Sequence, residues 1–258
     1  MLIWLVCTPA HYLHEVPLLP KTDPRRNHLL ASLPQDVWER WLPHLEVVDL
    51  PLGKVLYESG SQQRHVYFPT TAIVSLLFVL ESGSSAEIAV VGMEGMVDVS
   101  VFMGGSSTPS RAVVQSAGEG YRLNAHFMKE EFHKSAPVMH MMLRYTQALI
   151  TQMTQTAVCN RHHTLDQQLC RWLLLSLDRL PGSDLVMTQE LIANMLGVRR
   201  EGVTESALKL QRAGLIKVPR VPPPSTAPPT APTPAPMAVP FSWDVMPAQA
   251  LRLARVTA

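Results

Sequence analysis

The sequence RREGVTE, which begins at Arg199, places candidate base-reading side chains within two helical turns. An arginine such as Arg199 or Arg200 can donate two hydrogen bonds to guanine O6 and N7. A glutamate such as Glu201 or Glu205 can accept a hydrogen bond from the amino group of cytosine, and Thr204 can contact a base edge or a methyl group. Such residues at the beginning of a helix are typical of a helix that enters the major groove of DNA.

The flanking sequence predicts the two helices that must hold these side chains. Thr188 is a suitable N-cap for the first helix, QELIANML, and Gly197 stands where the turn needs a positive φ. Gly214 suits the position just after the second helix. Two helices joined by a short turn with glycine form a helix-turn-helix. The alternative is an amphipathic helix pair with a solvated charged face, which the combined spacing disfavours. The expected DNA-contacting residues are Thr188, Gln189, Arg199, Arg200, Glu201, Thr204, Glu205 and Lys209.

The net charge of the chain gives no indication of a strongly basic, nucleic-acid-binding protein. The 258 residues include 22 Lys and Arg and 21 Asp and Glu, so any DNA contact must come from a local patch. Cys7, Cys159 and Cys170 cannot form a paired disulfide framework, which favours a reducing compartment. No window reaches the roughly 18 consecutive apolar residues of a membrane span, and the first residues lack the basic region of a secretory signal. We therefore expect a cytoplasmic protein that does not enter a membrane.

Residues 46–125 contain many short runs of β-branched and aromatic residues, such as HVYFPTTAIVSLL, separated by Gly, Ser or Pro clusters. Short strands at regular intervals favour a β-barrel, sandwich or jelly roll. Gly53 and Gly60 are expected to supply turns that a side chain would obstruct. Helical patterns precede this region from Asn27 and follow it from residue 126, so the expected fold class is α+β.

Pro137 begins a long predicted helix that carries a heptad pattern. The pattern steps by 4, 3, 4, 3 and 4 residues and is apolar first and polar later. We interpret it as a dimer seam, because a polar second half suits a weaker, adjustable coiled coil and methionines make a surface that repacks easily. The alternative is that the helix lies on the β-rich domain of its own chain. The expected seam residues are Val138, Met142, Tyr145, Leu149, Gln152 and Thr156.

Between Asn27 and Ile216 the chain resembles the Crp/Fnr family of transcription regulators. The resemblance lies in PLGKVLYESG, HVYFPTTAIVSLL, VGMEGM, the long helix and, most specifically, TQELIANMLGVRREGVTESALKLQRAGLI. It implies an N-terminal double-stranded β-helix (jelly-roll) sensor of the cyclic-nucleotide-binding type, a dimerisation helix and a C-terminal winged helix-turn-helix. The expected units are a poorly ordered leader (1–26), the sensor (27–135), the dimerisation helix (136–163), the DNA-binding domain (164–217) and a Pro-rich tail (218–258).

The resemblance also implies partners and base-reading residues. A homodimer would bind double-stranded DNA at a palindromic operator, with RNA polymerase and a small-molecule effector as further candidate partners. Arg200 and Glu201 match the Arg-Glu pair with which many members read bases. Glu205 stands where the next reading residue is often arginine, so we expect a different operator sequence.

The sensor departs from a cyclic-AMP site. Met96 follows Gly95 where cyclic-AMP binders carry a glutamate for the ribose, and Ser110 precedes Arg111 where they carry an Arg-Ser pair for the phosphate. Arg111 could still hold the anion of another ligand. Three widely spaced cysteines cannot hold the four-cysteine iron–sulfur cluster of oxygen-sensing members, and the histidines show no haem-binding pattern. We therefore expect these four residues to form an altered pocket, with no cyclic AMP, no cofactor and no metal.

The composition changes abruptly after Lys217. Residues 218–240 contain ten prolines, each of which removes a strand hydrogen-bond donor and fixes φ. The sequence therefore predicts a helix-turn-helix that lacks a normal wing, the β-hairpin that would contact phosphates, and a tail that is extended or disordered. A frame change near codon 218 is our hypothesis, and a natural Pro-rich docking tail is the alternative.

The motifs favour regulation over catalysis. There is no Gly-rich phosphate loop, no HExxH and no GxSxG motif, and the carboxylates show no catalytic pairing, so we do not expect an enzyme. Our main hypothesis is a sequence-specific DNA-binding transcription regulator in which an unidentified signal at the sensor sets the spacing of two recognition helices. The alternative is a sensor or interaction module whose DNA binding is impaired because the Pro-rich tail replaces the wing.

Overall fold

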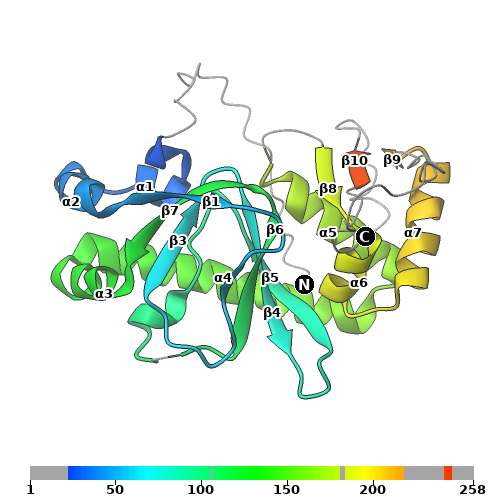
Figure 1. Cartoon of the computed structure of the whole chain (residues 1–258), viewed down its shortest axis with the longest axis horizontal. Helices are drawn as coiled ribbons and strands as arrows, with labels where there is room; N and C mark the ends of the chain where they lie inside the picture. Colours follow the sequence, from blue (N-terminus) through cyan, green and yellow to red (C-terminus); the bar gives the residue numbers. More distant parts are fainter. Residues whose placement is uncertain (1–22, 106, 181–183, 218–240, 246–258) are drawn as a thin grey trace, which may run out of the picture.

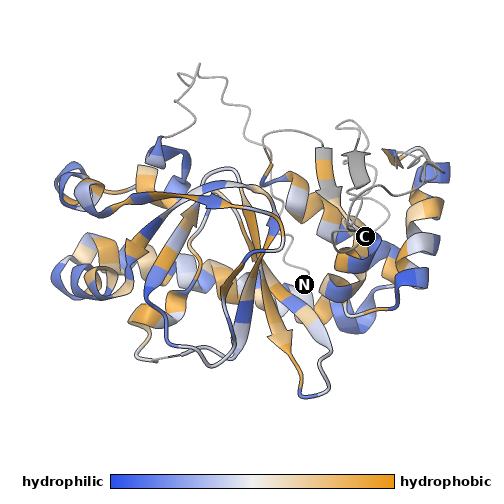
Figure 2. Cartoon of the chain, in the orientation of Figure 1, coloured by the Kyte–Doolittle hydropathy of each residue, from blue (hydrophilic) through white to orange (hydrophobic). Residues whose placement is uncertain are grey.

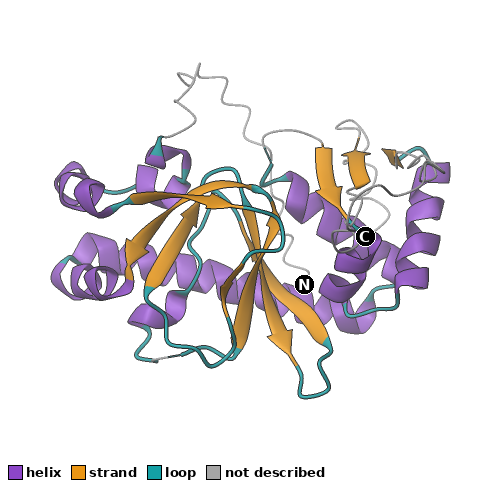
Figure 3. Cartoon of the chain, in the orientation of Figure 1, coloured by secondary structure: helices purple, strands orange, loops and turns teal. Residues whose placement is uncertain are grey.

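The computed structural model describes residues 23–105, 107–180, 184–217 and 241–245. A β-rich domain is followed by one long helix and then by a smaller, mainly helical domain (Figure 1). Figure 3 shows this division into a strand-rich and a helix-rich part, which confirms the predicted α+β class. Within the described ranges, no helix is long and apolar enough to cross a membrane.

Short helices close one end of the β-rich domain. Asn27 is fully buried, and its side-chain oxygen accepts hydrogen bonds from the N–H groups at the beginning of α1. Its amide group donates to the carbonyl oxygens of Pro69 and Gly95, at 2.9 and 2.8 Å. Asp23 caps the helical turn just before it, so the last residues of the predicted leader belong to the folded domain. The elements are η1 (Pro24–Arg26), α1 (His28–Ala31), α2 (Gln35–Trp41) and η2 (Leu42–His44).

Two antiparallel sheets form the β-rich domain, as the jelly-roll expectation required. Their strand orders are β1-β7-β3 and β2-β6-β4-β5. In β3, Val66 and Phe68 are fully buried, whereas His65 and Tyr67 are partly exposed, as expected when alternate side chains point to opposite faces. Figure 2 shows the hydrophobic residues concentrated on these strands. The strands are β1 (Glu46–Leu50), β2 (Val55–Tyr57), β3 (His65–Pro69), β4 (Ile73–Val79), β5 (Ser85–Val91), β6 (Ser110–Ser116) and β7 (Gly118–Asn124).

Three further helices complete the β-rich domain and lead away from it. The 3-10 helix η3 (Val99–Phe102) follows β5, and α3 (Ala125–Lys134) follows β7. The long helix α4 (Ala136–His162) has Pro137 in its first turn, where a missing N–H costs nothing. It runs past the barrel toward the second domain (Figure 1).

The predicted dimer seam of α4 instead faces the barrel of its own chain. Val138, Met142, Tyr145 and Leu149 are at most 9% exposed and belong to the barrel's apolar clusters. Gln152, a seam residue in the second half of the helix, is also bonded within its own chain. Its side chain accepts a hydrogen bond from the N–H of Val90 in β5 and donates one to the carbonyl oxygen of the same residue.

Thr156, the last seam residue, accepts a hydrogen bond from Arg171. The seam assignment is therefore wrong: the first five of these residues contact the β-rich domain of the same chain, which was the alternative. The opposite face of α4 carries the exposed apolar residues Leu143, Ile150 and Val158, each 48–49% exposed.

The second domain is built around a helix-turn-helix and a small sheet. Its sheet has the order β8-β10-β9 and is antiparallel. The predicted disordered tail is wrong at residues 241–245, which form the central strand; FSWDV contains no proline, so its N–H groups can pair. Residues 218–240, on which the missing-wing prediction rests, lie outside the described residues. The elements are α5 (Leu165–Leu177), β8 (Asp184–Met187), α6 (Gln189–Leu196), α7 (Arg200–Arg212), β9 (Ile216–Lys217) and β10 (Phe241–Val245).

A polar chain of side chains crosses the boundary between the two domains. Ser75 lies 2.5 Å from the carboxyl group of Glu87 and 2.7 Å from Gln115 Oε1. The Gln115 amide donates to Ser176 of α5, whose hydroxyl donates in turn to a backbone carbonyl. Because a hydroxyl has a single hydrogen, this chain is fully satisfied only when Glu87 is protonated and donates to Ser75.

We expect Glu87→Gln to stabilise the protein at alkaline pH. Burial raises the pKa of Glu87 from 4.5 to about 7, so the folded state holds the proton more tightly than the unfolded state. The stabilisation from protonation is complete below the unfolded pKa and is lost as the pH rises through about 7. Urea unfolding at several pH values should show that the variant lacks a decline of roughly 3 kcal/mol at most. Glu81→Gln, at an exposed residue, is the control; an unchanged decline in Glu87→Gln contradicts this account.

Candidate nucleic-acid interface

The first helix of the helix-turn-helix is capped as the sequence predicted. The Thr188 side chain accepts a hydrogen bond from the N–H of Leu191 at 3.1 Å. Ile192 and Ala193 are buried, so the inner face of α6 can meet α7 closely. Gly197 ends the helix with φ +65°, which confirms the predicted positive φ in the turn.

The second helix crosses α5 at a glycine that the sequence analysis did not single out. Val203, Ala207 and Leu210 of α7 are buried. A Cβ added at Gly202 would lie 2.8 Å from a terminal methyl carbon of Leu165 in α5, so a larger residue would require that side chain to move. A glycine inside an otherwise helical pattern was the available signal, because glycine there costs stability unless packing requires it.

The predicted DNA-contacting residues divide into an unengaged group and an engaged group. Arg199, Arg200, Glu201 and Glu205 are exposed at and near the beginning of α7. In the described part of the chain, neither arginine guanidinium has a hydrogen-bond or ion-pair partner, whereas Glu205 pairs with Lys209 at 3.2 Å. The arginines are therefore the side chains best placed to bind a ligand outside the protein.

The engaged group holds the motif together. Thr204 Oγ1 lies 2.7 Å from Gln189 Oε1, which joins α7 to the beginning of α6. Lys209 also lies 3.4 Å from Asp166 of α5, so a phosphate would have to compete with two carboxylates for this lysine. With Thr188 occupied as a cap, these four predicted contacts have structural roles in this conformation.

Three of the four predicted sensor-pocket residues, Gly95, Met96 and Arg111, do not line the cavity that Ser110 lines. Met96 is fully buried in the core, and its carbonyl oxygen accepts from the Tyr145 hydroxyl at 2.8 Å. A Cβ at Gly95 would lie 2.4 Å from that hydroxyl, so the glycine permits the helix to approach. Arg111 points outward to form an ion pair with Glu58 at 3.0 Å. The pocket assignment is therefore corrected at these three positions, since packing and strand alternation decide where each side chain points.

Ser110 does line a cavity of about 350 Å³, which we call the sensor cavity. It lies between the barrel, η3 and α4, and Asp98 is its charged residue among those described. Sequence reasoning missed Asp98; the available signal was a single carboxylate in the mostly apolar run MVDVSVFM.

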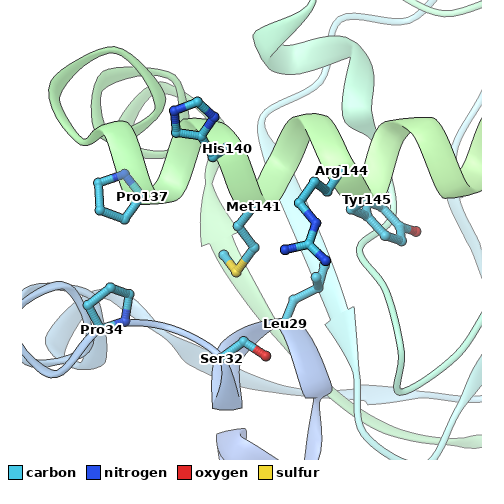
Figure 4. A pocket seen from close by; sticks show the side chains of 8 residues that line it. All are labelled: Leu29, Ser32, Pro34, Pro137, His140, Met141, Arg144 and Tyr145. Carbon is cyan, nitrogen blue, oxygen red and sulfur yellow. The ribbon is translucent and has the colours of Figure 1, made fainter.

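A second, larger groove of about 480 Å³ lies between the N-terminal helices and α4. Figure 4 shows Met141 and Arg144 of α4 on one side and Ser32 and Pro34 on the other. None of its lining residues belongs to the helix-turn-helix or to the sensor cavity.

Comparison with known proteins identifies the C-terminal motif and the fold. Residues 167–221 match the family described as the Crp-like helix-turn-helix domain. A transcriptional regulator of the Crp/Fnr family from Eubacterium rectale superposes with a TM-score of 0.64 at 16% identity, covering 90% of this chain and 99% of that one. The chain has the Crp/Fnr fold with a Crp-like helix-turn-helix domain. A sequence comparison with curated proteins found no match.

Two more solved structures share the Crp/Fnr fold over most of their length. FixK2 from Bradyrhizobium japonicum gives a TM-score of 0.63 at 14% identity, covering 83% of this chain and 98% of that chain. The c-di-GMP-responsive global regulator CLP of Xanthomonas campestris gives 0.57 at 17% identity, covering 71% and 95%. At these identities the similarity defines the fold, and the chemistry of each site must come from the residues of this chain.

We expect Gly197→Ala to destabilise the helix-turn-helix by about 1–2 kcal/mol, because alanine is strained at a positive φ. The added Cβ would meet Ala86 at an ordinary 3.5 Å, so strain and not collision sets the cost. Gly197→Asn is the matched control, since asparagine tolerates this conformation better. Urea unfolding should rank the stabilities as wild type, then Asn, then Ala. Equal losses in both variants would show that the backbone conformation of the turn is not the cause.

Proposed function

We propose that the protein is a homodimeric transcription regulator of the Crp/Fnr type that reads DNA with α7. The observation that carries the proposal is the pair of unengaged guanidinium groups of Arg199 and Arg200 at the beginning of α7. The turn at Gly197 and the burial of Val203 orient the first residues of α7 away from the protein core. A helix presented in this way can place its first residues against base edges in the major groove.

Charge near α7 supports base reading more than broad phosphate binding. The exposed arginines stand beside Glu201 and Glu205, so the local field is mixed. Arg212, in the last turn, adds a positive charge at the far end of the helix. Phosphate contacts set affinity and salt dependence, whereas base contacts set sequence preference. We infer that the protein discriminates between DNA sequences mainly through base contacts, and that its modest positive charge makes only a modest contribution to affinity.

The exposed face of α4 supplies the dimer contact in this proposal. Leu143, Gln147, Ile150, Thr154 and Val158 step by 4, 3, 4 and 4 residues along the side turned away from the barrel. Burying such a stripe against a second copy removes apolar surface from water. Two copies related by a two-fold axis would present two α7 helices to a palindromic operator.

An effector at the sensor would act through α4 in this proposal. The sensor cavity touches α4 at Leu149 and Met153, one helical turn from each other and on the barrel side of the helix. An occupant can therefore bias the position of α4 and, through the dimer contact, the spacing of the two recognition helices.

We expect Arg200→Ala to relax sequence preference at one position of the operator. The operator is first obtained by selection from random duplexes with the full chain. Loss of a bidentate contact to guanine should cost about 1–3 kcal/mol at that position and little elsewhere. Arg212→Ala removes the same charge from the far end of α7 and should change affinity without changing preference. Mobility-shift titrations with single-base operator variants make the comparison. Unchanged preference in Arg200→Ala would remove α7 from the proposal.

We expect Ile150→Glu to separate the dimer while leaving each subunit folded, because like charges would meet in an apolar contact. Leu149→Glu should instead unfold the sensor, since Leu149 is only 5% exposed within its own chain. Ala148→Glu, exposed on the other flank of α4, should do neither. Sedimentation and circular dichroism separate these outcomes. A folded Ile150→Glu protein that remains a dimer would show that another surface joins the subunits.

A further inference from the structure

The sensor cavity has an apolar body and a polar end. Leu76, Val99, Met103, Leu149 and Met153 supply most of its apolar wall. The polar groups are hydroxyls and one carboxyl group. A volume of about 350 Å³ suits a small organic molecule of the size that such cavities commonly bind. The polar lining residues are Tyr57, Asp98, Ser100, Thr108 and Ser110.

Asp98 is a buried carboxylate, and one of its two oxygens has no hydrogen-bond partner among the described residues. The residue is 3% exposed, and its Oδ1 accepts from both the N–H and the hydroxyl of Ser100. In the described part of the chain, its Oδ2 is buried and has no hydrogen-bond partner. No basic side chain lines the cavity among the described residues. A buried polar atom of this kind needs a donor, because burial without one costs free energy.

The neighbouring groups do not meet this need. Ser110 and Thr108 share a hydrogen bond at 2.9 Å, so these two hydroxyl groups are bonded to each other. Burial raises the pKa of Asp98, which is the direction expected for a carboxylate without a cation beside it. The backbone at Asp98 also has φ +80°, a conformation that aspartate and asparagine tolerate better than most residues.

We propose that the sensor cavity binds a small amphipathic amine, whose apolar body fills the cavity and whose ammonium group donates to Asp98 Oδ2. The proposal concerns the effector class of the sensor and rests on the proposed function only for the consequence of binding, not for binding itself. A charge-assisted hydrogen bond to a carboxylate in an apolar cavity is strong and selective. The same carboxylate repels anions.

Among the described residues that line this cavity, none supplies a counter-charge for an anionic ligand. Arg111, the residue expected to hold an anion, pairs with Glu58 outside it. A cyclic phosphate would therefore meet Asp98 instead of a guanidinium group. In this proposal one buried residue, Asp98, sets the charge of the ligand. That charge is positive, whereas the sequence had indicated Arg111 as a residue that could hold an anion.

Three probes of one shape test the proposal on the full chain by calorimetry. Tryptamine carries an ammonium group on an indole body, tryptophol carries a hydroxyl there, and indole-3-acetate carries a carboxylate. We expect tryptamine to bind in the roughly millimolar range or better, tryptophol more weakly, and indole-3-acetate at least about tenfold more weakly than tryptamine. The absence of tryptamine binding, or equal binding of all three probes, overturns the proposal.

Asp98→Asn identifies the residue responsible. Asparagine keeps the shape, tolerates the positive φ and can still accept the Ser100 hydrogen bonds, so the variant should fold, as a thermal melt will verify. It should lose about tenfold in tryptamine affinity and most of the preference over indole-3-acetate. Asp49→Asn, which removes the same charge from an exposed site on β1, should change neither. An unchanged preference in Asp98→Asn overturns the assignment. These measurements use no DNA, so their failure is distinct from a failure of the DNA-binding proposal.

Discussion

The packing of α4 against the barrel is the contact on which the other surfaces of the molecule depend. Tyr145 fixes the helix by donating to the Met96 carbonyl, and Gly95 leaves the space that the tyrosine ring occupies. With this face buried, Leu149 and Met153 are brought to the sensor cavity and the Ile150 face is turned outward. One helix thereby carries the barrel contact, part of the cavity and the proposed dimer contact.

The sensor and the helix-turn-helix are joined by a continuous core. Leu77 of β4 and Val113 of β6 belong to the same apolar cluster as Trp172, Ile192 and Val203 of the second domain. The polar chain from Glu87 to Ser176 crosses the same boundary. Closely packed cores do not deform gradually. They change between discrete arrangements of their side chains and helices. The boundary between the two domains is packed in this way, through shared apolar contacts and side-chain hydrogen bonds.

Charge acts locally in this protein. A net charge of +1 says little about binding, because the groups without a partner in the described part of the chain lie in separate environments. They are the guanidinium groups of Arg199 and Arg200 at the beginning of α7 and the Oδ2 atom of Asp98. Arg111 and Lys209, which the sequence selected for binding, are paired with carboxylates of the same chain. An ionisable side chain is available to a ligand only where the fold has left it without a partner.

The sequence by itself determined the features that depend on short-range spacing. Thr188 as a cap, Gly197 at a positive φ and the short strands of the β-rich domain follow from local backbone and hydrogen-bond chemistry, and the structure contains them. The DNA-contacting role of Arg200 follows from the same pattern and stays a prediction. Local rules suffice here because the groups that interact lie within a few residues of one another.

Tertiary structure decided which partner each face meets. The heptad at Val138 shows that one face is apolar, but a barrel and a second helix bury apolar surface equally well, so the pattern could not choose between them. Strand alternation and packing turned Arg111 outward and placed Asp98 in the cavity, from positions 13 residues apart in the chain. The pairing of β10 with β8 and β9, which are distant from it in the chain, likewise depends on tertiary structure. Contacts between distant segments depend on the geometry of the whole chain, which residue spacing does not contain.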